Sequence, residues 1–250
     1  MASPIQFYRN FQALMQRHGI RHVLTSGMAC VEYGIQQNTK DTDLDFFGQP
    51  PRVRLEEIFT DRENHLAAPL IVAQMKKTDR DKDWPMVESL SWYAEDDWDA
   101  LLHLRSVEKL QVRWGDCPTD LRAGLSRRRP LLRELDLGAV KPVKCLAIER
   151  MIWEQVNKQR YRRYQAEWKD FLRRWRAEPG HEWPVVMAFA DQHILLGDAA
   201  SRHRLPMNPL GGQAQRQSLI EHAWVAVAEV FDGEEQLIQR LSPPIAELLP

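Results

Sequence analysis

The stretch that decides the predicted fold reads Leu24-Thr25-Ser26-Gly27-Met28-Ala29-Cys30, followed by Asn38-Thr39-Lys40-Asp41-Thr42-Asp43-Leu44-Asp45-Phe46. A short apolar run ends in a serine–glycine turn, and a helix-compatible segment, 28–35, follows the turn. Residues 41–47 then alternate aspartate with other residues, and alternation with a period of two is typical of a strand with two unlike faces. These features together predict a strand, a glycine turn, a helix and a second strand.

Asp41, Asp43 and Asp45 occupy alternate positions of the second predicted strand, so their carboxylates share one face. Neighbours on that face lie about 7 Å apart, because a strand rises about 3.3 Å per residue. At this distance two carboxylates repel by about 2.4 kcal/mol at an effective dielectric constant of about 20. A divalent cation reverses the sign of this interaction, since Mg²⁺ prefers carboxylate oxygens. The pattern indicates a site for Mg²⁺ or Mn²⁺; an exposed edge strand guarded by charges is the alternative interpretation.

Ser26 and Gly27 lie where the first predicted strand meets a helix. The start of a helix presents free backbone N–H groups and a positive dipole end, which suits a phosphate. A glycine also lets a ligand approach the backbone closely, because it has no side chain. A strand, a glycine turn, a helix and a carboxylate strand therefore form a minimal arrangement for holding a metal–nucleotide complex, although an ordinary strand-to-helix turn would read the same way.

The order Ser26-Gly27, short helix, Thr39-x-Asp41-x-Asp43-Leu44-Asp45-Phe46 resembles the nucleotidyltransferases of the DNA polymerase β superfamily. It is nearest the bacterial branch that includes type IV toxin–antitoxin toxins. The segment from Lys76 to Val87, which contains Arg80-Asp81-Lys82-Asp83-Trp84-Pro85, is similar to the Arg-x-Lys-Asp-Trp-Pro element of those bacterial proteins. The resemblance spans roughly residues 20–110. In the superfamily a third carboxylate lies on a neighbouring strand; here Asp41 stands in for it, or the role is lost.

The resemblance implies an α+β fold, in which a small mixed β-sheet with helices forms a nucleotidyltransferase-like domain at 1–115. A helical domain at 116–250 follows a Gly-Asp-Cys-Pro break at 115–118. The implied activity is metal-dependent transfer of a nucleotidyl group from an NTP to a hydroxyl of an RNA or a protein. The implied site residues are Asp43 and Asp45 as metal ligands and catalytic groups, Asp41 as a further catalytic carboxylate, and Ser26, Gly27, Lys76 and Lys82 as nucleotide-binding groups.

Two other classes of function remain open. One is a degenerate, non-catalytic member of the same fold that binds a partner through its helical half, and an absent third carboxylate favours it. The other is a purely helical interaction protein without a site, against which the aspartate strand argues. An antitoxin partner follows only from the toxin-like branch of the resemblance.

Helical periodicity marks most of the remaining chain. Helices are expected at 4–18, 66–77, 84–93, 98–112, 183–197 and 213–230, with one long helix beyond Pro142 that ends before Pro179-Gly180. The long helix has an apolar and aromatic stripe (Val143, Leu146, Ala147, Trp153, Val156, Tyr164, Trp168, Phe171, Leu172 and Trp175). Its opposite face is basic (Arg160, Arg162, Arg163, Lys169, Arg173 and Arg174).

Charge is distributed unevenly along the chain. Lys plus Arg is 34 and Asp plus Glu is 35 overall, yet residues 122–176 hold 16 basic side chains against 6 acidic ones. Such asymmetry predicts either internal ion pairing or an anionic partner, here an RNA such as tRNA bound along 158–176.

Cysteine use and hydropathy indicate the compartment. The three cysteines, Cys30, Cys117 and Cys145, lie far apart without a CxxC pair, which is typical of reduced thiols in a cytoplasmic protein. Neither a signal peptide nor a membrane span is expected from the apolar runs.

Overall fold

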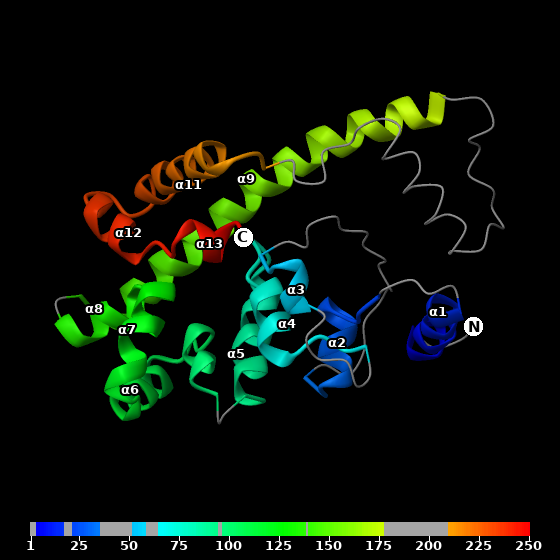
Figure 1. Cartoon of the computed structure of the whole chain (residues 1–250). Coiled ribbons are helices and arrows are strands. Elements are labelled where there is room, and N and C mark those ends of the chain that lie inside the picture. Colours follow the sequence, from blue (N-terminus) through cyan, green and yellow to red (C-terminus); the bar gives the residue numbers. More distant parts are fainter. Residues whose placement is uncertain are drawn as a thin grey trace.

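The computed structural model describes residues 4–17, 22–35, 52–58, 65–94, 97–138, 140–177 and 210–250, and this part of the chain is mainly helical (Figure 1). Its helices are α1 (Pro4–Arg17), α2 (Ser26–Glu32), α3 (Leu55–Ile58), α4 (Pro69–Met75), η1 (Asp81–Asp83), α5 (Trp84–Trp92), η2 (Trp98–Leu102), α6 (Val107–Asp116), α7 (Thr119–Arg128), α8 (Leu131–Leu137), α9 (Pro142–Ala177), α11 (Gln213–Ala228), α12 (Glu235–Leu241) and α13 (Ile245–Leu248), where η denotes a 3₁₀-helix. None of these helices is long and apolar enough to cross a membrane.

The predicted α+β class with a mixed β-sheet is wrong for the described residues, which contain no strand and no sheet. The apolar run before the glycine turn forms one isolated parallel bridge, Leu24 with Leu66. The N–H of Leu24 donates to the carbonyl of His65 (2.6 Å), and the N–H of Ala67 donates to the carbonyl of Leu24 (3.0 Å). The pairing stops there because both segments continue as helices. Helix α2 begins at Ser26, and α4 begins at Pro69, which has no N–H to donate.

The helices expected from periodicity agree with the structure in position more than in length. The expected helix at 4–18 is α1, and that at 84–93 is α5. The segment at 98–112 is divided into η2 and α6, because Ser106 starts a new helix by accepting a hydrogen bond from the N–H of Lys109. The expected strand at 41–47 and the expected helix at 183–197 lie outside the described residues.

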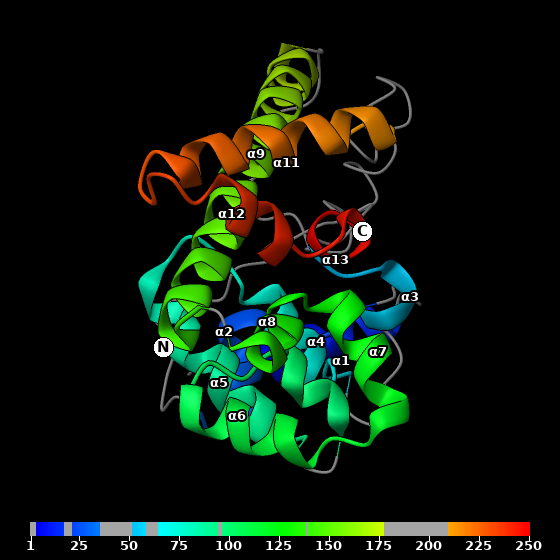
Figure 2. The same ribbon diagram turned by 90° about the vertical axis from the view of Figure 1, so that its left-hand side faces the viewer.

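Helix α9 is the axis on which the C-terminal part is arranged (Figures 1 and 2). Helices α11 and α12 pack along it, and α8 contacts it near its N-terminal end. Helices α4 and α5 pack against each other, and α2 contacts α4. The prediction of one long helix beyond Pro142 is confirmed by α9, which spans 36 residues.

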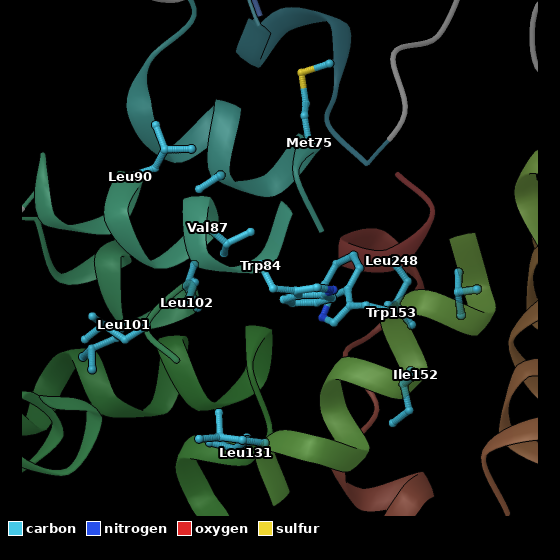
Figure 3. Close-up of a cluster of buried hydrophobic side chains, with 14 of the residues drawn as sticks. Met75, Trp84, Val87, Leu90, Leu101, Leu102, Leu131, Ile152, Trp153 and Leu248 are labelled. Atoms are coloured by element: carbon cyan, nitrogen blue, oxygen red, sulfur yellow. The ribbon is translucent and has the colours of Figure 1, made fainter. Parts of the chain in front are cut away.

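Buried apolar side chains from Leu24 to Leu249 form one continuous core in the described part of the chain. Figure 3 draws Trp84 of α5, Trp153 of α9 and Leu248 of α13 in one cluster of this core. The core thus includes residues on both sides of position 115, while the division into domains at 1–115 and 116–250 stays a prediction. The three cysteines are free and buried, as expected.

We predict that Ile152→Ala lowers the free energy of unfolding by about 2–5 kcal/mol, because Ile152 is fully buried where α9 meets this core. Val143→Ala, an aliphatic truncation on the same helix at a side chain that is 68% exposed, should change it by less than about 0.5 kcal/mol. Urea denaturation of both variants is the measurement. Equal small effects would show that the packing of α9 does not stabilise the protein as described.

Candidate functional site

The Ser26-Gly27 turn begins α2 directly after the Leu24 bridge. Thr25 before it is extended, and its side chain makes no capping hydrogen bond. The backbone of Ser26 has φ +57°, a left-handed conformation that costs a residue with a side chain about 1–2 kcal/mol. Backbone strain of this kind occurs preferentially at functional sites, so the strained backbone of Ser26 favours a functional role for this residue.

Asp83 is the centre of a buried ionic cluster made by the segment 76–84. Its carboxylate, fully buried, accepts hydrogen bonds from Lys76 Nζ (3.1 Å), Thr78 Oγ1 (2.6 Å) and Arg80 Nε (2.8 Å). Burial alone would raise the pKa of Asp83, but the Thr78 hydrogen bond and the positive charges of Lys76 and Arg80 lower the pKa below its ordinary value. The Nε1–H of Trp84 donates to the carbonyl of Thr78 (3.1 Å) and closes the turn.

One of the two predicted phosphate-binding lysines, Lys76, directly follows α4, and α4 contacts α2, the helix that begins at the glycine turn. Burial raises the pKa of the Cys30 thiol on α2, and the charges of Lys76 and Asp83 also act on this thiol, so the ionic cluster lies close to α2. Lys76 is itself buried and paired with Asp83. Lys82, in contrast, is exposed on η1.

A second cluster lies beside the first, around the amide of Asn157 on α9. Arg52 Nη1 donates to Asn157 Oδ1 (2.6 Å), and Arg160 Nη2 donates to the same oxygen. Asn157 Nδ2 in turn donates to Asp79 Oδ1 (2.6 Å). Arg52 also donates from Nη2 to the carbonyl of Met75, so the cluster joins the end of α4 to α9. Two guanidinium groups thus share one neutral acceptor.

Both arginines of this cluster are buried, which corrects the placement of Arg160 on the exposed basic face of the long helix. Burial, followed by the charge of Arg160, moves the pKa of Arg52 well below its usual value. Burial lowers the pKa of Arg160 to about 10. No motif or periodicity singles out Arg52 or Asn157, so the sequence carried no signal for their role.

A third cluster contains the buried carboxylate of Glu149. Arg129 contacts it through Nε and Nη2, both at 2.7 Å, and Arg105 Nη1 lies 2.5 Å away. Burial would raise the pKa of Glu149, but these guanidinium groups and the charge of Lys77 lower it to about 2. Lys77 Nζ donates to the carbonyl of Leu102 (3.0 Å), and burial lowers its pKa to about 7.

This third cluster also satisfies backbone carbonyls at the ends of several elements. Arg129 Nη1 donates to the carbonyls of Leu101 (2.6 Å) and Leu104 (2.9 Å), and Arg105 Nη2 donates to that of Leu146 (2.7 Å). With Glu149 bonded by two guanidinium groups and the remaining donors on backbone carbonyls, the Glu149 cluster holds several elements together.

The predicted metal ligands Asp43 and Asp45, together with Asp41, lie outside the described residues. Within the described ranges no group of three or more His, Cys, Asp or Glu side chains could hold a metal ion. Comparisons of the chain with protein-family models, with curated proteins and with solved structures each found no match. The Ser26 turn and the polar clusters at Asp83 and Asn157 are therefore the candidate functional groups in the described part of the chain.

We predict that Asp83→Asn destabilises the protein by about 3 kcal/mol, because it leaves the ammonium group of Lys76 buried without a counter-charge. Asp81→Asn is the matched control on the same 3₁₀-helix: its side chain is 94% exposed, and the cost should stay below about 1 kcal/mol. Chemical denaturation at neutral pH measures both. Similar losses in the two variants would mean that the buried pair contributes no more than a surface contact.

Proposed function

We propose that this protein binds an NTP together with Mg²⁺ or Mn²⁺ and transfers the nucleotidyl group to a hydroxyl of an RNA or protein acceptor. The observation that carries the proposal is the contact of α4, which ends directly before Lys76, with α2, the helix that begins at Ser26 and Gly27. The two segments that resemble nucleotidyltransferases are distant in sequence, and their proximity in the fold is what a shared site requires. The strained backbone of Ser26 supports the same assignment.

Each residue has a definite task in the proposed reaction. Asp43 and Asp45 hold the metal, whose chemistry when bound is to activate the attacking oxygen and to neutralise the leaving pyrophosphate. Backbone N–H groups at Ser26 and Gly27 orient the phosphates. Lys76 supplies a fixed positive charge, since its pairing with Asp83 restricts the ammonium group to one position.

Asp41 is assigned to accept the proton of the attacking hydroxyl, and Lys82 to contact phosphate from the surface of η1. If Asp41 does not act as the base, the same site binds a nucleotide without turning it over, and the protein acts as a binding module. An antitoxin partner belongs to the same proposal and follows from the resemblance alone, whereas the proposed cytoplasmic location follows from the spacing of the cysteines.

We predict that Asp43→Asn combined with Asp45→Asn abolishes binding of NTP–Mg²⁺, because the metal loses its charged ligands. The matched control is Asp116→Asn combined with Asp120→Asn, which removes two exposed carboxylates elsewhere. Isothermal titration calorimetry with each of the four NTPs is the measurement. Equal affinity in the wild type and the Asp43/Asp45 variant would sink the metal site. Incubation with labelled NTP and tRNA then separates transfer from binding alone.

The basic part of the chain, residues 122–176, contains the candidate surface for binding an RNA acceptor. Many of its basic side chains are paired internally: Arg122, Arg128, Arg129, Lys144 and Arg150 each contact a carboxylate within 4.0 Å. Further along α9, Arg162 and Lys169 are exposed, as is Tyr161 at 59%. Exposed basic and aromatic side chains together suit single-stranded RNA, which stacks its bases and pairs its phosphates.

We predict that tRNA binds this part of α9 with a steep dependence on salt. Each phosphate contact contributes a log–log slope of about −0.7, so about four contacts weaken binding about fiftyfold between 50 and 200 mM salt. Arg162→Gln combined with Lys169→Gln should weaken binding and make the slope shallower by about 1.4. Fluorescence anisotropy with labelled tRNA measures both, and absence of binding at 50 mM salt would end the RNA assignment.

A further inference from the structure

Arg52 and Arg160 are buried cations that lack a carboxylate partner among the described residues. Their side chains are 8% and 6% exposed, and each donates a hydrogen bond to the neutral amide oxygen of Asn157. Arg52 also donates to a backbone carbonyl, while its buried Nε–H has no acceptor in the described part of the chain. Buried charges are normally paired, because removing an ion from water costs several kcal/mol.

The charges around Asn157 do not balance. Lys76 and Arg80 both contact Asp83, and Asp79 accepts from Asn157. Among the described residues, four positive side chains, Arg52, Lys76, Arg80 and Arg160, therefore share two carboxylates, Asp79 and Asp83. The charges of Arg160, Asp83, Arg80 and Asp79 all act on Arg52, so these groups occupy one neighbourhood. The described side chains of this neighbourhood thus carry an excess of two positive charges.

The backbone at Arg52 is strained in a way that a purely apolar packing role does not require. Its φ is +66°, which costs a residue with a side chain about 1–2 kcal/mol. Such strain persists where the surrounding structure fixes it, and it gathers at ligand-binding positions. Solvent reaches the cluster at its edge, because Asp79 is exposed and the Arg80 side chain is 54% exposed.

We propose that Arg52 and Arg160, linked through Asn157, bind the phosphate oxygens of an NTP. A phosphate group fits better than a carboxylate, because it carries the two missing charges on one group and its oxygens accept from several guanidinium N–H donors at once. The inference rests on the proposed function for the identity of the ligand, but it assigns the phosphate chain to residues outside the motifs that carry the resemblance. Asp83 and Arg80, whose charges act on Arg52, join this anion site to the ionic cluster that contains Lys76.

The test uses tripolyphosphate in the presence of EDTA, so that the metal site makes no contribution. Calorimetry at constant ionic strength should show binding to the wild type, with affinity at least about tenfold lower in Arg160→Gln. The control Arg133→Gln, at an exposed arginine of α8, should stay within about twofold of the wild type. Arg160→Lys, which keeps the charge without the planar fork, should recover part of the loss. Arg160 is chosen over Arg52 because Arg52 also contacts the backbone of Met75, so its replacement risks the fold.

Equal tripolyphosphate affinity in the wild type and Arg160→Gln overturns the inference, as does no binding to the wild type at about 10 mM. Displacement of tripolyphosphate by a 5′-hydroxyl RNA oligonucleotide but not by an NTP would also overturn it, because the phosphate would then belong to an RNA backbone. Asp43→Asn with Asp45→Asn should leave tripolyphosphate binding in EDTA unchanged. If the proposed function is wrong, the wild type does not bind NTP–Mg²⁺. If the arginine site is wrong, Arg160→Gln does not weaken tripolyphosphate binding in EDTA. The two failures are therefore distinguishable.

Discussion

The carboxylate of Glu149 is the constraint on which the position of α9 depends. It is almost fully buried and accepts hydrogen bonds from Arg129 and Arg105, whose remaining donors reach backbone carbonyls on η2, on the segment after it and on α9. A buried charge pair of this kind contributes little net stability compared with apolar packing, yet removal of one partner is costly. It therefore fixes which face of α9 lies against the rest of the described chain.

The face of α9 that lies against the rest of the described chain also positions the cluster around Asn157. An α-helix repeats every 3.6 residues, so Trp153, Asn157 and Arg160 follow Glu149 at spacings of three and four along one side of α9. Trp153 fills the core, and Asn157 and Arg160 reach Arg52 and Asp79. The far end of the same helix carries exposed Arg162 and Lys169. One helix thus connects the structural ion pair, the anion cluster and the basic surface.

The sequence predicted the helices better than the site. Period-3.6 patterns located α1, α5, α9 and α11, and α5, α9 and α11 each bury apolar side chains on one face. The sheet was wrong for the described residues, since the apolar run at 22–24 reads as a strand but pairs at one residue only. Arg160 was expected among exposed bases, because periodicity reports apolar faces and is silent on cations buried with polar partners.

The cluster around Asp83 and the cluster around Asn157 differ in how completely their buried charges are paired. Asp83 has its charge matched by Lys76 and Arg80 and its second oxygen bonded by Thr78, so nothing further is needed to stabilise it. Arg52 and Arg160 are also buried, at 8% and 6% exposed, and they share one neutral oxygen. The Nε–H of Arg52 has no acceptor among the described residues. The proposed phosphate would supply the acceptors that Arg52 and Arg160 lack among the described residues. The strained φ of Arg52, beside a carboxylate cluster without such strain, points the same way.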